Sequence, residues 1–187
     1  MLYYLKQKAI AINLVVMTCN WLTVSFCYYL ITYEMKYLPG NIFFNSYASC
    51  TAEFLSTIFY GVVLQYLGLK WGLIATNCLA CTGTLLIIVW GWHAPGEWVL
   101  PILILFVKIG LNGMFFCLYL GNNMVFPTLF AVTAMGISNA IAKVATIGAP
   151  LLAEVPGTTS LWMIVGLTFT SQIACLFLRD STESKSH

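Results

Sequence analysis

Long apolar runs, separated by short polar interruptions, follow one another along almost the whole chain. A helix needs about 20 predominantly apolar residues to cross the hydrocarbon core of a bilayer. Runs of about this length predict six membrane-spanning helices, over residues 9–33, 42–67, 71–92, 98–120, 129–152 and 158–178. Lipid offers backbone groups no hydrogen-bond partner, so each run must satisfy its own groups as a helix. The pattern therefore predicts an all-α membrane protein with six transmembrane helices.

Turn-forming residues mark the boundaries between these runs. Pro39-Gly40 and Gly68 fall between helices, and the Gly-Asn-Asn sequence at 121–123 is expected to end the fourth helix. The chain is thus divided into a basic leader at 1–8, a six-helix transmembrane bundle at 9–178 and a polar tail at 179–187.

The composition excludes several classes of protein. Of 187 residues, 60% are hydrophobic and 7% are charged, whereas a soluble domain has about 25% charged residues. So few charged side chains cannot cover the surface of a water-soluble monomer. A net charge of +2 without a basic stripe argues against nucleic-acid binding. The seven cysteines lie inside apolar runs and are expected to be buried thiols.

The sequence lacks the residue patterns of common catalytic and metal sites. Cys78 and Cys81 form a CxxC pair, but no second pair and no nearby histidine completes a zinc site. There is no nucleophile–histidine–acid set, Walker loop or HExxH motif, and His93 is the one histidine inside the bundle range. We therefore expect no enzymatic activity, no metal and no cofactor.

Basic residues in short loops predict the orientation of the chain, because they favour the cytosolic side of a membrane. In the six-helix topology Lys36 stands alone on one side, and five basic residues share the other. These five are Lys6, Lys8, Lys70, Arg179 and Lys185. Both termini are therefore expected on the cytosolic or equivalent side. The host membrane stays open between the mitochondrial inner membrane and the plasma membrane.

Three ionisable residues, Glu53, Lys108 and Lys143, lie well inside the predicted spans. Each would cost about 2.5–3.5 kcal/mol at the bilayer centre, so all three are expected to point into the bundle. They either form a site in which the lysines counter an anion and Glu53 tunes them, or form an internal Glu–Lys pair. Four polar residues near the start of the second helix could line a polar cavity or make interhelical hydrogen bonds: Asn45, Ser46, Ser49 and Thr51.

A series of motifs recurs along the apolar runs. It comprises Cys27-Tyr28-Tyr29, Leu38-Pro39-Gly40-Asn41-Ile42-Phe43-Phe44-Asn45 with Glu53, Leu67-Gly68-x-Lys70, Lys108-x-Gly110 with Tyr119, Phe126-Pro127-Thr128, and Gly136-Ile137-Ser138-x-x-Ile141-Ala142-Lys143 continuing to Pro150. In order and spacing the series resembles helices seven to eleven of the organic cation/anion transporters of the major facilitator superfamily (solute carrier family 22). The resemblance extends from about residue 10 to residue 178.

The resemblance implies the C-terminal six-helix half of a major facilitator superfamily fold. Such transporters have two six-helix halves, bind substrate between them near the midplane, and expose the site alternately by rocking one half against the other. For a transporting chain, the resemblance implies five substrate-binding residues. They are Asn45, Glu53, Lys108, Tyr119 and Lys143.

The chain departs from these transporters at the charged positions that latch one of their states. Those positions hold Gln65, Tyr66, Leu69, Met124 and Ala131. Lys143 stands where the anion-transporting branch usually has arginine. A lysine keeps the charge but loses the planar bidentate fork, which would weaken carboxylate recognition.

Two functional hypotheses follow. In the first, the chain is a transporter-derived accessory or structural subunit of a larger membrane complex, for which an organellar respiratory or other energy-transducing assembly is one candidate host. Other integral membrane subunits and lipids would then cover the face of the missing half. In the alternative, the protein transports small organic ions by alternating access, as a homodimer or with a separately encoded N-terminal half.

Overall fold

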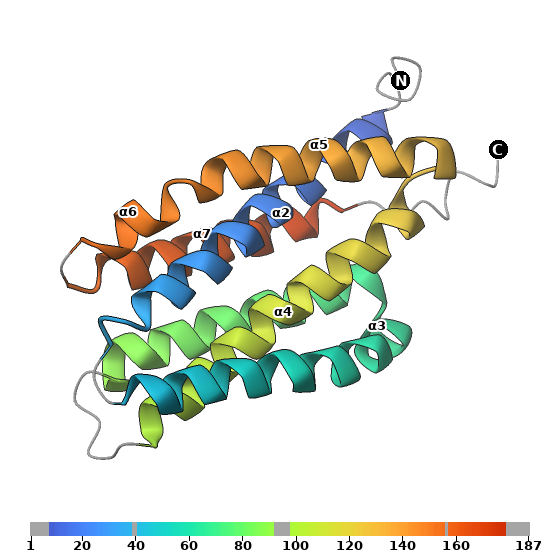
Figure 1. The fold of residues 1–187 in the computed structure, drawn as a ribbon. Coiled ribbons are helices and arrows are strands. Elements are labelled where there is room, and N and C mark those ends of the chain that lie inside the picture. Colours follow the sequence, from blue (N-terminus) through green and yellow to red (C-terminus); the bar gives the residue numbers. More distant parts are fainter. Residues whose placement is uncertain (1–7, 39–40, 92–97, 156, 179–187) are drawn as a thin grey trace.

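The computed structural model describes residues 8–38, 41–91, 98–155 and 157–178, most of which are helical (Figure 1). The elements are α2 (Lys8–Glu34), α3 (Ile42–Leu86), a short π-helix η1 (Ile87–Gly91), α4 (Val99–Val125), α5 (Thr128–Thr146), α6 (Ala149–Ala153) and α7 (Thr159–Leu176). No strand occurs within these ranges, in agreement with the predicted all-α class. The predicted leader, apart from Lys8, and the predicted tail lie outside them.

Among the described residues, five helical stretches are long and apolar enough to cross a membrane. They are Ala9–Glu34, Leu64–Trp90, Val99–Val125, Thr128–Ala153 and Thr159–Leu176. The protein is therefore an integral membrane protein by the length and composition of its helices. The predicted span at 42–67 is helical but is not one of the five. Its polar residues, Glu53 among them, reduce the apolar character of this stretch.

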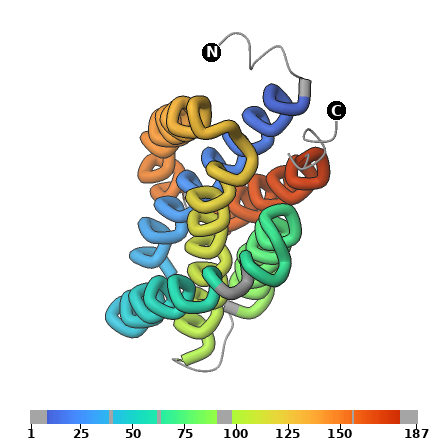
Figure 2. The backbone as a smooth tube through the Cα atoms, turned by 90° about the vertical axis from the view of Figure 1, so that its right-hand side faces the viewer, coloured from blue at the N-terminus to red at the C-terminus, as the bar shows by residue number. Residues whose placement is uncertain are grey.

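A turn at Gly68 divides α3 into a first segment (42–67) and a second segment (69–86). Gly68 has φ 70° and ψ 175°, a conformation that glycine adopts without the steric penalty of a Cβ atom. In Figures 1 and 2 the two segments run back alongside each other. The helix boundary that was predicted at Gly68 is thus present as a reversal of the chain.

The predicted break at 121–123 is wrong, because α4 continues to Val125. A Cβ atom at Gly121 would lie 2.2 Å from Leu69 Cδ1, so glycine serves here for close packing and not for a turn. The Asn122 amide donates a 2.8 Å hydrogen bond to the carbonyl oxygen of Ala131. Gly121 therefore allows close packing against α3 without ending α4.

The predicted helix at 129–152 is interrupted after Thr146 and resumes as α6. Pro150 has no backbone N–H and cannot donate to the carbonyl of Thr146. The turn tightens instead, with bonds from Ile147 N to Val144 O (3.3 Å) and from Gly148 N to Ala145 O (3.1 Å). This break follows closely after Lys143, which lies in the last turn of α5.

The helices form two layers, as Figures 1 and 2 show. One layer consists of α5, α2, α4 and the first segment of α3, and its outer surface is called here the front face. Helix α7 and the second segment of α3 lie behind this layer. Helices α5 and the first α3 segment border the front face, with α2 and α4 between them. The first residue of α2 and the last residue of α7 lie at the same end of the bundle.

A buried polar cluster joins α2 to the rear layer. Asn20 is fully buried, and its Oδ1 accepts hydrogen bonds from Ser171 Oγ (2.8 Å) and Cys175 Sγ (3.2 Å). Its amide nitrogen donates to Val16 O at 2.9 Å. In a bilayer, where apolar burial adds little between helices, hydrogen bonds of this kind contribute to helix association.

Replacing Asn20 by Ala is expected to lower the free energy of unfolding by about 1 kcal/mol, the usual scale of interhelical hydrogen bonds in membrane proteins. Unfolding of the purified protein in mixed micelles with increasing SDS would measure this change. Asn139→Ala is the matched control, because Asn139 has no side-chain hydrogen bond to the described residues. Equal stability of the two variants would contradict the prediction.

Candidate functional site

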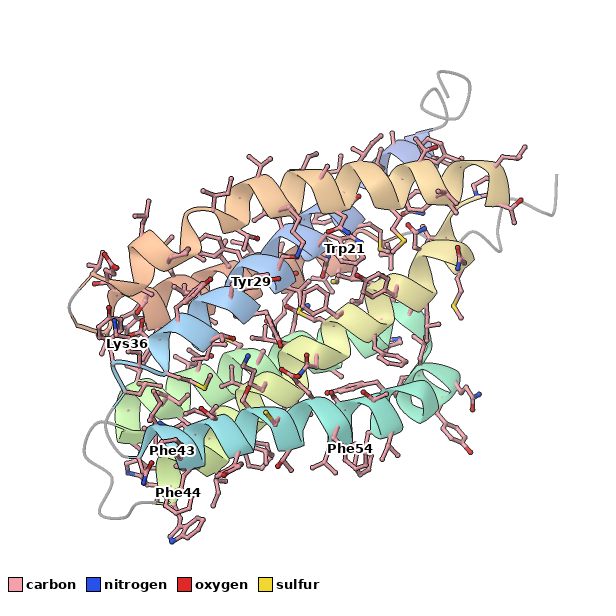
Figure 3. All side chains as sticks on the ribbon, viewed as in Figure 1. Trp21, Tyr29, Lys36, Phe43, Phe44 and Phe54 are labelled. Atoms are coloured by element: carbon pink, nitrogen blue, oxygen red, sulfur yellow. The ribbon has the colours of Figure 1, made fainter. Side chains whose placement is uncertain are left out.

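Aromatic side chains line the middle of the front face. Tyr28 and Tyr29, consecutive on α2, have ring centroids 5.6 Å apart and planes at 87°. The Tyr28 ring also contacts Phe115 of α4 edge-on at 5.7 Å, and Tyr119 of α4 contacts Trp21 of α2 at 4.8 Å. Figure 3 shows Trp21 and Tyr29 on α2, between α5 and α4. These five side chains are called the aromatic cluster.

Lys108 is fully buried beside this cluster, at 0% exposure. Its Nζ donates a 2.5 Å hydrogen bond to Thr32 Oγ1 and lies 3.8 Å from the centroid of the Tyr28 ring. The face of an aromatic ring attracts a cation, more strongly when water is excluded. The Thr32 hydroxyl and the Tyr28 ring are thus the groups that the structure places around this ammonium.

Glu53 lies exposed on the first segment of α3, where its Oε1 accepts a hydrogen bond from the Tyr28 hydroxyl. The ring of Tyr28 thus contacts the Lys108 ammonium, and its hydroxyl donates to the Glu53 carboxylate. Within the described part of the chain, Lys108 Nζ has no carboxylate at ion-pair distance. The hypothesis of a direct internal Glu–Lys pair is wrong, because Tyr28 lies between the two groups.

Lys143 is also exposed, on α5. Its Nζ donates to the Tyr29 hydroxyl at 3.3 Å and lies 4.9 Å from the Tyr29 ring centroid. The expectation that all three ionisable residues point into the bundle is correct for Lys108 alone. Glu53 and Lys143 lie on the front face, where the described residues leave both side chains exposed.

The structure brings four of the five sequence-predicted residues to one region and separates the fifth. Tyr119 belongs to the aromatic cluster and is 47% exposed. Asn45 lies two helical turns before Glu53 and is fully buried. Neither amide atom of Asn45 has a hydrogen-bond partner among the described residues. Asn45 therefore lies apart from the groups that surround Tyr28.

Sequence reasoning did not assign contacts to Tyr28, Tyr29, Thr32 or Phe115. Tyr28 and Tyr29 belong to the Cys27-Tyr28-Tyr29 motif, but the sequence assigns neither residue a role in the site. Thr32 follows Tyr28 by four residues, a spacing that puts both on one face of a helix. That spacing was the available signal for Thr32. No pattern in the sequence marked Phe115.

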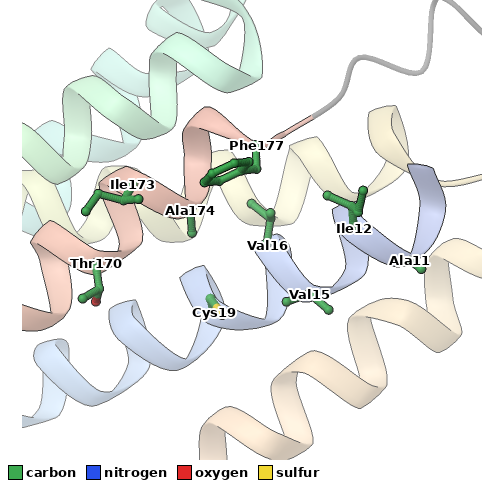
Figure 4. Close-up of a pocket in the computed structure, with 9 residues that line it drawn as sticks. All are labelled: Ala11, Ile12, Val15, Val16, Cys19, Thr170, Ile173, Ala174 and Phe177. Atoms are coloured by element: carbon green, nitrogen blue, oxygen red, sulfur yellow. The ribbon is translucent and has the colours of Figure 1, made fainter. Parts of the chain in front are cut away.

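A groove lies away from these charges, between the first half of α2 and the second half of α7 (Figure 4). This groove has a volume of about 580 Å³. Its lining consists of Ala11, Ile12, Val15, Val16, Cys19, Thr170, Ile173, Ala174 and Phe177. The Thr170 hydroxyl is turned to the carbonyl oxygen of Leu167. The groove offers no charged group to a ligand, so the front face is the better candidate site for an ion.

Among the residues that the structure describes, no group of three or more His, Cys, Asp or Glu side chains comes together as a metal site. Around the aromatic cluster the structure places the Glu53 carboxylate, the exposed Lys143 ammonium and the buried Lys108 ammonium. Such groups can hold a small charged molecule by ion pairing and by cation–π contact.

No family model matches the sequence. The chain is 23% identical over 164 residues to the human organic cation/carnitine transporter 2, a match that covers 86% of this chain and 29% of that protein. It is also 23% identical over 136 residues to svop-1 of Caenorhabditis elegans, whose name marks it as a candidate transporter; this match covers 73% of the chain and 25% of svop-1. The chain is a transporter-like membrane protein. It spans less than a third of the length of either relative.

Proposed function

We propose that this transporter-like protein binds small organic ions on its front face and moves them across a membrane by alternating access. The observation that carries the proposal is the pair of exposed opposite charges, Glu53 and Lys143, which two consecutive tyrosines hold beside the aromatic cluster. Ionisable side chains within membrane helices mark substrate or ion pathways. No covalent step is required.

The architecture behind this proposal is half of a major facilitator superfamily fold. The two α3 segments count as separate helices on either side of Gly68, and α5 with α6 counts as one broken helix, which makes six long helices among the described residues. In this arrangement the front face is the wall of the substrate path. The complementary wall comes from a second copy or from a separately encoded half. Broken helices near a binding site are common in transporters.

The substrate class that fits the front face best is a small zwitterion. Lys108 is fully buried and already in contact with Thr32 and Tyr28, so the charges open to a ligand are the Lys143 ammonium and the Glu53 carboxylate. A ligand carboxylate would pair with Lys143, and a quaternary ammonium would lie against Glu53 and the tyrosine rings. The name of the human relative includes carnitine, which carries both groups.

The accessory-subunit hypothesis rests on the missing latch charges, at positions such as Gln65 and Met124. The comparisons do not support it over transport. Loss of a latch changes how one state is stabilised but leaves the exposed charges of the front face in place. We therefore propose transport as the function and keep the accessory role as the outcome that a failed transport assay would favour.

Uptake of labelled carnitine into vesicles that contain the purified protein tests the proposal. Lys143→Ala is expected to reduce uptake by about 10- to 100-fold, the effect of losing a charged hydrogen bond. Lys36→Ala is the matched control: Lys36 Nζ lies 5.0 Å from the Tyr37 ring centroid and 3.5 Å from its hydroxyl, but outside the aromatic cluster. Equal uptake by the two variants would remove Lys143 from the site.

Ligand choice gives an independent readout. Glu53→Gln is expected to weaken binding of carnitine and of a tetraalkylammonium cation, while binding of benzoate is unchanged or stronger. Equilibrium binding to the protein in lipid nanodiscs measures all three ligands. Failure of every ligand to bind the unmodified protein would contradict the proposed function.

A further inference from the structure

The two exposed charges of the front face lie at the same level of the bundle. The Glu53 carboxylate accepts from the Tyr28 hydroxyl, and the Lys143 ammonium donates to the Tyr29 hydroxyl. Consecutive residues of a helix differ by only about 1.5 Å along its axis. A carboxylate and an ammonium are thus anchored at nearly equal depth, one on each side of α2.

Lipid is a poor occupant for a face of this kind. Hydrocarbon gives neither charge a partner, and charged side chains in membrane helices almost always meet protein or water. The hydrogen bonds to the tyrosines leave Lys143 with donors to spare and Glu53 with acceptors to spare. An occupant of the front face should therefore present one basic and one acidic group at this depth.

A second copy of this chain meets that requirement by symmetry. Two copies that enter a membrane in the same orientation are related by an axis along the membrane normal, which keeps every residue at its depth. Because α5 and the first segment of α3 border the front face on opposite sides (Figures 1 and 2), the axis brings α5 of one copy against that segment of the other. An interface of this symmetry repeats each contact twice.

The two border helices also carry small exposed residues beside their charges. On α5, Gly136 and Ala140 precede Lys143 at helical spacing, and no heavy atom lies within 4 Å of a Cβ atom placed at Gly136. On the first α3 segment, Cys50 and Thr57 flank Glu53 on the exposed surface. Small residues at a spacing of four allow membrane helices to approach closely.

We propose that the front face binds a second copy of this chain through two symmetric ion pairs, each between Glu53 of one copy and Lys143 of the other. The inference rests on the proposed function in that the second copy supplies the opposite wall of the substrate path. In the empty dimer the pairs close the path, and an ion that enters competes for them.

Charge reversal in lipid nanodiscs or vesicles tests the pairing. Each single variant, Glu53→Lys or Lys143→Glu, is expected to reduce the dimer fraction by about tenfold or more, because like charges then face each other. The double variant Glu53→Lys/Lys143→Glu restores both pairs. The two single variants, carrying different tags, capture each other but not themselves. Single-molecule photobleaching and tag-specific co-purification measure these outcomes without any ligand.

A second variant tests the close approach without changing charge. Gly136→Leu is expected to reduce the dimer fraction, whereas Gly166→Leu on α7, where the space around the glycine is also open, leaves it unchanged. A monomeric wild-type protein, reversals that leave dimers intact, or a double variant that does not recover would each overturn the inference. Carnitine uptake by strictly monomeric protein would also overturn the inference, but it would support the proposed function. Dimers that take up no ligand would remove the proposed function alone.

Discussion

Thr32→Val is expected to lower the free energy of unfolding by about 1–3 kcal/mol, and by no more than the loss of its local hydrogen bond to the Tyr28 carbonyl once Lys108 has been replaced by Met. Thr32 Oγ1 is the hydrogen-bond acceptor of the fully buried Lys108 ammonium, at 2.5 Å. Among the contacts described for this cation, loss of the Thr32 hydroxyl leaves the Tyr28 ring, whose centroid lies 3.8 Å from Nζ. Removing the ammonium as well removes the unmet donor, so the two substitutions should be strongly non-additive.

Unfolding in SDS-containing micelles measures this cycle. Thr168→Val serves as the control, since Thr168 is fully buried and also donates to the carbonyl four residues before it, as Thr32 does. The control reports the loss of that local hydrogen bond alone. If Thr32→Val costs no more than Thr168→Val, or if the double variant is additive, Thr32 does not support the buried charge.

Gly110→Leu is expected to prevent folding, and Gly110→Ala to destabilise the bundle by about 1–3 kcal/mol. A Cβ atom at Gly110 would lie 2.6 Å from Ala80 N and 2.8 Å from Thr76 O. These are backbone atoms of α3, which cannot rotate away as the end of a side chain can. The whole contact between α3 and α4 would have to open.

The yield of monodisperse protein after detergent extraction checks this prediction. Gly166→Leu is the control, because no heavy atom lies within 4 Å of a Cβ atom at Gly166. It should be extracted as well as the unmodified protein. Normal recovery of Gly110→Leu would show that the two helices do not pack as closely as the structure has them.

The candidate site was only partly predictable from the sequence. Glu53, Lys108 and Lys143 stood out because charge inside an apolar run is costly, whatever the fold. The same argument predicted that all three face inward, which is correct for Lys108 alone. The free-energy cost of a charge inside the membrane can also be offset by a partner outside this chain. Tyr28 connects two of the charges, and no local pattern can show such a contact between α2, α3 and α4.

The ends of the helices were likewise only partly predictable from the sequence. The reversal at Gly68 was predictable, because a glycine between apolar runs frees the backbone for a left-handed conformation. Gly121 looked the same in sequence but lies within α4, where it makes room for Leu69. From the neighbouring sequence alone, a glycine at a chain reversal cannot be distinguished from a glycine that leaves room for a neighbouring side chain.

The sequence alone determined that this is an all-helical membrane protein, where most of its helices lie, and which residues carry charge inside them. These properties depend on runs of about 20 residues, each of which must satisfy its own backbone in lipid. The tertiary structure decided which charges are covered and which stay open. That choice depends on which helices pack on either side of a residue. Thr32 and Tyr28 enclose Lys108, whereas Glu53 and Lys143 stay exposed within the part of the chain that the structure describes.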